Sequence, residues 1–244
     1  MTKQMASKLR FLSNHHLFQD FSPSQIEQLA RKTTRLTYQP GRHLYRAGQI
    51  GQRLFILQKG RVDLYRLTPQ GRKLIVRTLG AGAVFGEMAL IGNKIYEAFA
   101  VSVGPSYVYI ISNVEVYGFM CQIPRFAFRL IEFMGGQLLE CERRLEQMAF
   151  LGVPSRLASR LLDISDQNQE IHGYSHQEFA EMIGVYRETV SITLRTFKTL
   201  GLIDIGRLRI EIIDRQGLEK IVAQNMYLTK KNDIRLIKSQ LGKE

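Results

Sequence analysis

Residues Ser175–Lys198 read SHQEFAEMIGVYRETVSITLRTFK, and this stretch decides the fold of the C-terminal part of the chain. Ala180 lies four positions before Gly184, and Val190 lies six positions after it. Two helices that cross steeply need a small residue at their contact, a glycine in the tight turn and an apolar anchor in the second helix. The spacing therefore predicts a helix-turn-helix.

Both predicted helices carry further signals. Ser175 and Glu178 form a capping box at the start of the first helix. An arginine can donate two hydrogen bonds to guanine and a glutamate can accept one from cytosine, so the second helix can read base edges in double-stranded DNA. We expect Arg187 and Glu188 to reach bases, and Arg195 and Lys198 to contact phosphate or solvent. The predicted DNA-binding residues are Tyr186, Arg187, Glu188, Ser191, Arg195 and Lys198.

The segments around this motif complete a predicted C-terminal domain. A helical pattern at Ser155–Ser165 precedes it. Two short β segments, Ile203–Ile205 and Arg207–Ile213, follow it and turn at Gly206, which predicts a wing. The polar and basic tail, residues 227–244, is expected to be a short helix or a frayed end.

The N-terminal half has a different pattern, in which glycines separate short apolar segments. A capped helix is predicted at residues 22–33, with Ser22 or Ser24 as its N-cap. Short strands with turn signals at this spacing are typical of an antiparallel sandwich or jelly roll, and residues 69–71 (PQG) predict one hairpin turn. The predicted strands are Arg42–Tyr45, Arg53–Leu57, Arg61–Leu67, Lys73–Leu79, Ala83–Phe85, Phe99–Val103 and Tyr107–Ile111.

A long helix is predicted after Pro124, which suits a first helical turn. Its apolar residues alternate spacings of three and four, as in a coiled-coil seam, and this favours a homodimer over a helix packed only on its own domain. Gly135-Gly136 is expected to interrupt the helix. Cys141 is either a small packing residue or a redox sensor. The predicted dimer seam consists of Ile131, Met134, Leu138, Cys141, Leu145 and Met148.

Composition excludes several classes of protein. The chain has 244 residues, 45% hydrophobic and 23% charged, as is typical of a globular protein. It has no apolar stretch of signal-peptide length near its N-terminus and none that approaches a membrane span, so we expect a cytoplasmic protein without membrane contact.

Catalytic and metal-binding patterns are also missing. The two cysteines, Cys121 and Cys141, are too few for a disulfide framework and too far apart for a typical metal-ligand pair. The five histidines form no HExxH or HxH grouping, and the sequence has no GxSxG or P-loop motif. We expect no metal, no cofactor and no enzymatic activity.

The positive charge is unevenly distributed. Residues 1–150 carry 20 Lys and Arg against 10 Asp and Glu, whereas residues 151–244 carry 14 against 12. Twelve basic residues and one acid, Asp63, lie between Arg31 and Arg77. A solvated basic face explains this segment, and a contact with flanking DNA or an anionic protein is the alternative.

Residues 85–90 (FGEMAL) form a second motif. A glycine turn followed by an acid and a helical turn can present backbone N–H groups to an anion, as a phosphate cradle does. A structural turn explains the same residues equally well.

Five segments, in this order along the chain, resemble the CRP/FNR family of bacterial transcription regulators. They are residues 41–49 (GRHLYRAGQ), 54–66 (LFILQKGRVDLYR), 79–91 (LGAGAVFGEMALI), 148–162 (MAFLGVPSRLASRLL) and 183–194 (IGVYRETVSITL). The resemblance implies an α+β chain with an N-terminal β-roll (jelly roll), a long dimerisation helix and a C-terminal winged helix-turn-helix. It also implies homodimers that bind palindromic promoter sites, respond to a signal in the roll and, as activators, contact RNA polymerase.

The sequence departs from the family pattern in the roll. The cAMP-binding members continue from the FGE turn to an Arg followed by Ser or Thr, where this chain has Tyr96-Glu97, or Glu97-Ala98. A carboxylate repels phosphate, and the bidentate guanidinium contact is missing, so we expect no cAMP binding. Glu87 stands where the family has its ribose contact, or it only caps the turn. The candidate pocket residues are Phe85, Gly86, Glu87, Tyr96 and Glu97.

The chain can also be compared with members of the family that respond to signals other than cAMP. The N-terminal cysteine cluster of the oxygen-sensing members is missing. The cyanobacterial nitrogen regulators, which respond to 2-oxoglutarate, also lack the cAMP arginine and share the GNK stretch at residues 92–94. Ile192 stands where the family often has Arg, so one guanine contact is lost and the half-site is expected to differ from TGTGA and TTGAT.

These observations predict four regions, with residues 14–122 as a cyclic-nucleotide-binding-like sensory domain and 123–151 as the dimerisation helix. Residues 152–226 are the winged helix-turn-helix domain, and residues 227–244 are the basic tail. The predicted function is a homodimeric DNA-binding regulator with an unidentified small-molecule effector. The alternative, a sensory module that regulates a partner protein, leaves the helix-turn-helix unexplained.

Overall fold

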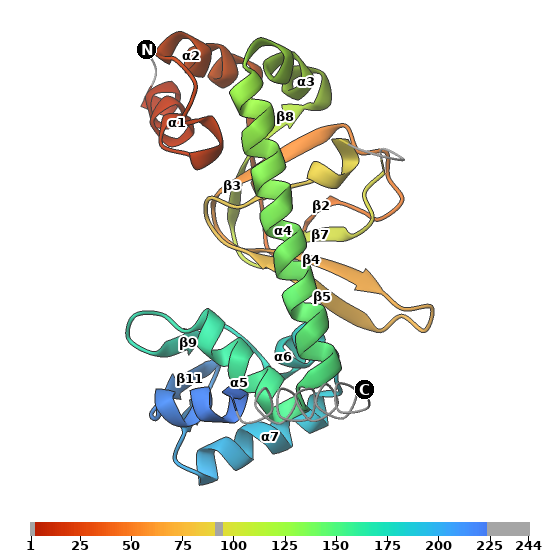
Figure 1. Cartoon of the computed structure of the whole chain (residues 1–244), viewed down its shortest axis with the longest axis vertical. Helices are drawn as coiled ribbons and strands as arrows, with labels where there is room; N and C mark the ends of the chain where they lie inside the picture. Colours follow the sequence, from red (N-terminus) through yellow and green to blue (C-terminus); the bar gives the residue numbers. More distant parts are fainter. Residues whose placement is uncertain (1–2, 91–94, 224–244) are drawn as a thin grey trace, which may run out of the picture. The chain divides into compact units, whose positions relative to one another are not determined.

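The protein is described by a computed structural model in which residues 3–90 and 95–223 are defined (Figure 1). The chain divides into two compact units, Met1–Gln137 and Leu138–Glu244. The GNK stretch at residues 92–94 and the tail at residues 227–244 lie outside the described residues. The four predicted domain boundaries stay predictions.

The first unit contains two antiparallel sheets of four strands each, which together form the expected β-roll. Their strand orders are β1-β8-β3-β6 and β2-β7-β4-β5, so strands that are distant in sequence pair with one another. The hairpin β4–β5 turns at residues 68–72, as predicted. The strands are β1 (Thr34–Tyr38), β2 (His43–Tyr45), β3 (Arg53–Lys59), β4 (Val62–Leu67), β5 (Lys73–Leu79), β6 (Val84–Phe85), β7 (Phe99–Ser102) and β8 (Ser106–Ser112).

The first sheet has two buried faces, and β3 shows why. Side chains alternate between the faces of a strand. Leu54 and Ile56 therefore pack with the helices, whereas Phe55 and Leu57 face the interior of the roll. This explains why β3 reads as a continuous apolar run rather than as an alternating pattern.

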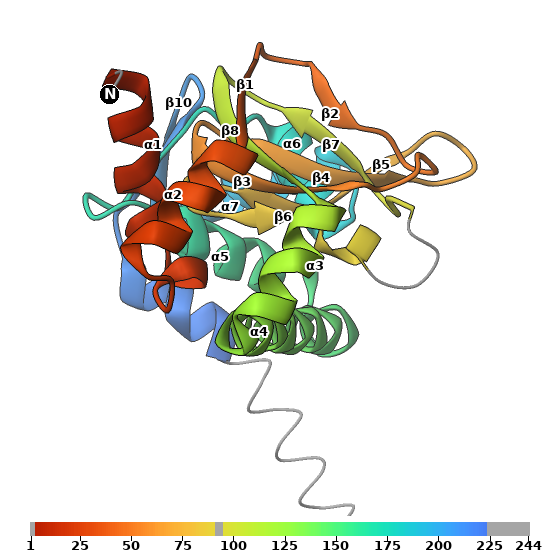
Figure 2. The same ribbon diagram turned by 90° about the horizontal axis from the view of Figure 1, so that it is seen from above.

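Helices cover the outer face of the first sheet (Figure 2). Ser22 is the N-cap of α2 and forms a capping box with Gln25. Two of the helices, α1 and α3, were not predicted from the sequence. The helices of this unit are α1 (Lys3–Ser13), η1 (His16–Phe18), α2 (Pro23–Lys32), η2 (Glu87–Leu90), α3 (Asn113–Gln122) and the beginning of α4 (Pro124–Phe150).

Helix α4 runs without a break through Gly135-Gly136, so the expected interruption is wrong. A glycine lowers the stability of a helix by about 1 kcal/mol relative to alanine but removes no hydrogen bond, and only a proline would do that. Phe126 and Leu130 are buried among the helices of the first unit. Their burial anchors the start of α4.

After α4, the second unit contains the helices α5, α6 and α7, a helical stretch at residues 215–223 and a small sheet of order β10-β11-β9. The predicted two-stranded wing is thus incomplete, because β9 pairs with β11. Gly206 pairs with Arg209, so the turn lies at residues 207–208 and not at Gly206. The elements are α5 (Val153–Ile164), β9 (Glu170–His172), α6 (His176–Ile183), α7 (Arg187–Thr199), β10 (Ile203–Gly206) and β11 (Arg209–Ile212).

No helix in the described ranges has both the length and the apolar composition that crossing a membrane requires. Over the same ranges, no group of three or more His, Cys, Asp and Glu side chains is arranged to hold a metal ion.

The turn between β3 and β4 gives a stability prediction. Gly60 has φ +106°, and a Cβ atom there would lie 2.6 Å from the carbonyl oxygen of Pro105. Gly60→Ala should therefore lower the free energy of unfolding by at least about 2 kcal/mol, from backbone strain and overpacking. Urea denaturation measures the effect. Gly80→Ala is the control, because nothing lies within 4 Å of its Cβ position, and equal stability of the two variants would contradict the prediction.

Candidate DNA-reading surface and sensory cavity

The junction of α6 and α7 has the geometry that the sequence predicts. The Ser175 hydroxyl accepts from the backbone N–H of Glu178, and the Glu178 carboxylate accepts from the backbone N–H of Ser175 at 2.8 Å. Gly184 ends α6 in the left-handed conformation, with φ 70°, and its N–H donates to the carbonyl of Ala180. Ala180 and Val190 are both buried. These contacts form the helix-turn-helix.

Helix α7 is divided into a buried and an exposed face. Val190, Thr193, Leu194 and Phe197 are buried, and this spacing follows one side of the helix. Five of the six predicted DNA-binding residues are exposed: Tyr186, Arg187, Glu188, Arg195 and Lys198.

Polar side chains on this face stay available for an external partner. Within the described residues, the side chains of Arg187, Glu188 and Arg195 form no ion pair. An exposed guanidinium or carboxylate remains hydrated until a partner replaces its water. The face can therefore both donate and accept hydrogen bonds.

Ser191 differs from these residues because its hydroxyl is already used. The Ser191 Oγ donates to the carbonyl of Arg187 at 3.0 Å and lies 2.9 Å from His176 Nδ1. Since the hydroxyl hydrogen goes to Arg187, His176 is the donor in the second contact. Burial, followed by the charge of Arg187, lowers the pKa of His176. Ser191 thus ties α7 to α6.

Lys198 is also engaged within the unit. Its ammonium lies 2.7 Å from the Asp204 carboxylate on β10, and both side chains are about half exposed. This contact lowers the pKa of Asp204. The predicted role of Lys198 on phosphate therefore requires the ion pair to open.

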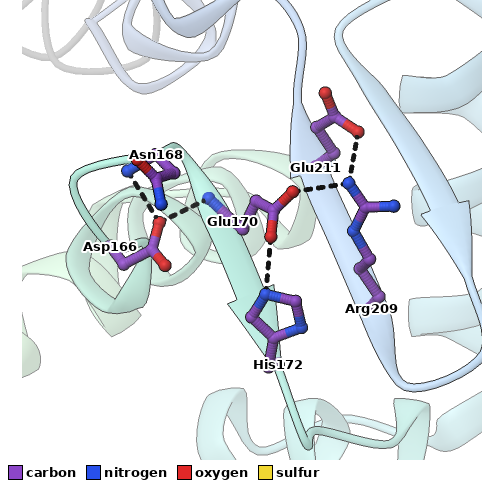
Figure 3. Close-up of polar contacts among 6 residues, drawn as sticks. All are labelled: Asp166, Asn168, Glu170, His172, Arg209 and Glu211. Carbon is purple, nitrogen blue, oxygen red and sulfur yellow. Dashed lines mark hydrogen bonds and ion pairs between the residues drawn. The ribbon is translucent and has the colours of Figure 1, made fainter.

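A polar network joins the strands of the wing (Figure 3). Arg209 on β11 binds the carboxylates of Glu170 and Glu211, and Glu170 also contacts His172 Nε2 at 2.7 Å. The Arg209 guanidinium, followed by His172, holds the pKa of Glu170 below its usual value. At the base of β9, Asp166 accepts from the backbone N–H of Glu170 at 2.9 Å. The network fixes the wing but neutralises the charge of Arg209.

Four of the five predicted pocket residues line one cavity in the roll, of about 130 Å³: Gly86, Glu87, Tyr96 and Glu97. The fifth, Phe85, is fully buried and stacks on Phe55 with ring centroids 5.1 Å apart, so it belongs to the core. Pockets for drug-sized ligands have roughly 300–1,000 Å³. The cavity is small by this measure.

The carboxylates in this cavity face arginines of the same chain. Glu87 is only 5% exposed, and its Oε1 lies 3.3 Å from Arg77 Nη1. Burial raises the pKa of Glu87, and Arg77 opposes that rise. Glu97 lies 3.8 Å from Arg66. Neither arginine was predicted, because β4 and β5 reach the FGE turn only in the folded sheet.

Tyr96 fills space in the interior of the roll. Its ring stacks on Tyr45 with centroids 3.9 Å apart, and its hydroxyl donates to the carbonyl of Arg53 at 3.1 Å. Only 5% of Tyr96 is exposed. The ring of Tyr96 therefore belongs to the packed interior of the roll.

The predicted dimer seam lies mostly in water. Met134 is partly buried and Cys141 is exposed. Phe128 and Leu139, which are outside the seam, are also exposed. The seam residues with the largest apolar exposure are Ile131 (63%), Leu138 (61%), Leu145 (67%) and Met148 (57%).

Several charges of the basic segment between Arg31 and Arg77 are paired within the first unit. Lys32 binds Glu115, and Arg31 lies 3.9 Å from Glu27. The guanidinium of Arg35 lies over the Tyr107 ring at 4.5 Å. These contacts involve three of the twelve basic residues, and the two explanations of the segment both stay predictions.

The fold and these sites define a class of protein in which a sensory roll and a winged helix-turn-helix share one chain. Residues 35–122 match the model of the cyclic nucleotide-binding domain, and residues 155–221 match the Crp-like helix-turn-helix domain. The chain belongs to the CRP/FNR family of DNA-binding transcription regulators.

Individual relatives agree with this assignment. The chain is 27% identical over 206 residues to the cyclic AMP receptor protein of Thermus thermophilus, covering 84% of this chain and 95% of the relative. It is 27% identical over 208 residues to the global nitrogen regulator of Synechococcus elongatus, covering 81% and 90%. A putative regulator of the same family from Eubacterium rectale shares the fold, with a TM-score of 0.72 at 20% identity, covering 85% and 98%.

Proposed function

We propose that the protein acts as a homodimer that reads a palindromic promoter site with α7 and is not switched by cAMP. The observation that carries the proposal is the exposed polar face of α7, on which Arg187, Glu188 and Arg195 form no ion pair with any described residue. A member of the family that activates transcription would also contact RNA polymerase.

The dimer is supported by the apolar seam of α4. Full burial of a leucine-sized side chain is worth about 1.5–3 kcal/mol. Leu138 and Leu145 obtain little of this burial within one chain. A second α4 alongside would bury both, and it would hold two α7 helices in the paired arrangement that a palindrome needs.

The effector assignment is supported by the cavity in the roll. The carboxylate of Glu87 is paired with Arg77, and the ring of Tyr96 stacks on Tyr45. The family's phosphate-binding arginine is expected to be replaced by Tyr96 or by Glu97. An effector bound here is therefore small, and its binding does not depend on the phosphate–arginine contact that a cyclic nucleotide makes.

Selection of bound DNA from a random pool tests the function. The pool is incubated with the protein alone, with cAMP and with 2-oxoglutarate. We expect an enriched palindrome whose half-sites lie about one helical turn apart, and the same enrichment with cAMP. A pool without any enriched sequence under all three conditions would refute the proposal.

Titration calorimetry checks the cAMP prediction. No heat of binding is expected at micromolar cAMP, because the family's arginine contact to phosphate is missing and the arginines that line the cavity, Arg66 and Arg77, are paired with Glu97 and Glu87. The cyclic AMP receptor protein of Thermus thermophilus serves as the positive control. Saturable micromolar binding of cAMP to this protein would show the prediction to be wrong.

The dimer seam is tested with Leu138→Glu combined with Leu145→Glu. Each substitution places an unpaired charge in the proposed interface, so the double variant should sediment as a monomer and lose affinity for the palindrome. Leu139→Glu is the matched control, since Leu139 is equally exposed but lies outside the seam. A double variant that remains dimeric would contradict the seam.

Arg187 is tested by binding to operators with single base changes. Arg187→Ala should cost about 1–3 kcal/mol per half-site and relax the preference at one G·C pair. Arg195→Ala should instead weaken binding to all operators alike and lower the salt dependence. An equal loss for every operator in the Arg187→Ala variant would make Arg187 a phosphate contact.

A further inference from the structure

Ile192 is the large apolar side chain on the otherwise polar exposed face of α7. It is 63% exposed and lies two residues beyond the buried Val190, roughly 200° around the helix. It therefore points away from the core that holds α7 in place. Glu188 lies one turn before it, and Arg195 lies three residues after it.

The stability of the helix does not explain this residue. A β-branched side chain loses rotamer freedom in a helix and is a poorer helix former than Ala, Lys or Gln. At 63% exposure, Ile192 gains little from burial. What distinguishes it from an isolated apolar surface residue is its position among the side chains proposed to contact bases.

Several hydroxyl groups on this helix donate to carbonyls of its own backbone. Thr196 Oγ1 donates to the carbonyl of Ile192 at 3.1 Å, and Thr199 Oγ1 donates to the carbonyl of Arg195 at 3.0 Å. Ser191 is held in the same way. These hydroxyls have their donor hydrogens engaged, and Ile192 is the residue on this face that can make an apolar contact.

The methyl group of the major-groove edges is the 5-methyl group of thymine, and it is the partner that apolar side chains contact. An isoleucine cannot hydrogen-bond to a base, and it would leave guanine or cytosine groups without a partner. We propose that Ile192 contacts a thymine methyl group in each half-site and selects T·A at that position. This inference rests on the proposed function.

The position of the thymine follows from helix geometry. Ile192 lies four residues from Glu188, about 6 Å along the axis of α7. Base pairs are 3.4 Å apart along DNA. The thymine therefore lies within about two base pairs of the pair that Glu188 contacts.

Deoxyuridine substitution tests the contact, because it removes the methyl group and leaves every hydrogen-bonding group in place. Each thymine of the selected operator is replaced in turn, and affinity is measured by fluorescence anisotropy. One position should lose about fourfold per half-site, and about 15-fold when both half-sites are changed, as expected for one buried methyl group. At that position, Ile192→Ala should bind the thymine and uracil operators equally.

Two further variants sharpen the test. Leu200→Ala is the matched control, since Leu200 is also 63% exposed but follows the end of α7, and it should keep the uracil penalty. Ile192→Arg should shift the preference at the same pair from T·A to G·C, because arginine binds guanine in a bidentate manner.

The outcomes separate the inference from the function. A uracil penalty at one position that Ile192→Ala abolishes supports the inference. An operator whose uracil versions all bind wild-type protein like thymine, or a penalty that persists in Ile192→Ala, overturns the inference and leaves the proposed function intact. If no operator is enriched at all, the proposed function fails and the inference fails with it.

Discussion

The apolar side chains of α4 cannot all be buried by one copy of the chain, and much of the molecule depends on this constraint. Phe126 and Leu130 are buried in the first two turns, where α1, α2 and α3 surround them. From Ile131 onward the seam remains largely exposed. Packing against a second copy would bury this surface, and the resulting dimer would contain two α7 helices. Burial of the seam would then stabilise the arrangement in which two α7 helices bind DNA together.

The two units differ in whether the charged side chains of their candidate sites form ion pairs within the chain. In the roll, Glu87 and Glu97 each face an arginine of the same chain, so the cavity has little unbalanced charge to offer a ligand. On α7, Arg187 and Glu188 have no such partner among the described residues. The charged side chains of α7 can therefore form ion pairs or hydrogen bonds with a partner molecule. Those in the cavity of the roll already form ion pairs with one another.

The glycine-separated strands and the helix-turn-helix could be predicted from the sequence because each depends on local spacing. The elements that were missed carry weak local signals. Strand β1 is mostly exposed, and β9 has a single buried residue, Ile171. Helix α3 has apolar residues nearly all round and Gly118 in its middle, so no periodicity stands out.

The residues of the candidate sites also fall into those that local sequence predicts and those that only the folded structure brings together. Arg187 and Glu188 could be identified because they follow the turn glycine directly, and the FGE turn could be identified as a motif. Arg77 and Tyr45 could not, since they come from β5 and β2 and reach Glu87 and Tyr96 only through sheet pairing. The hydroxyl bonds that occupy Ser191 and Thr196 likewise required coordinates.

Gly135-Gly136 lowers the helix propensity in the middle of α4, directly before the division of the chain at residues 137 and 138. Neither glycine is needed for space, because no atom of the described residues outside the helix's own backbone lies within 4 Å of their Cβ positions. Backbone hydrogen bonds open most easily where helix propensity is lowest, so α4 should open at these two residues before it opens in the turns on either side.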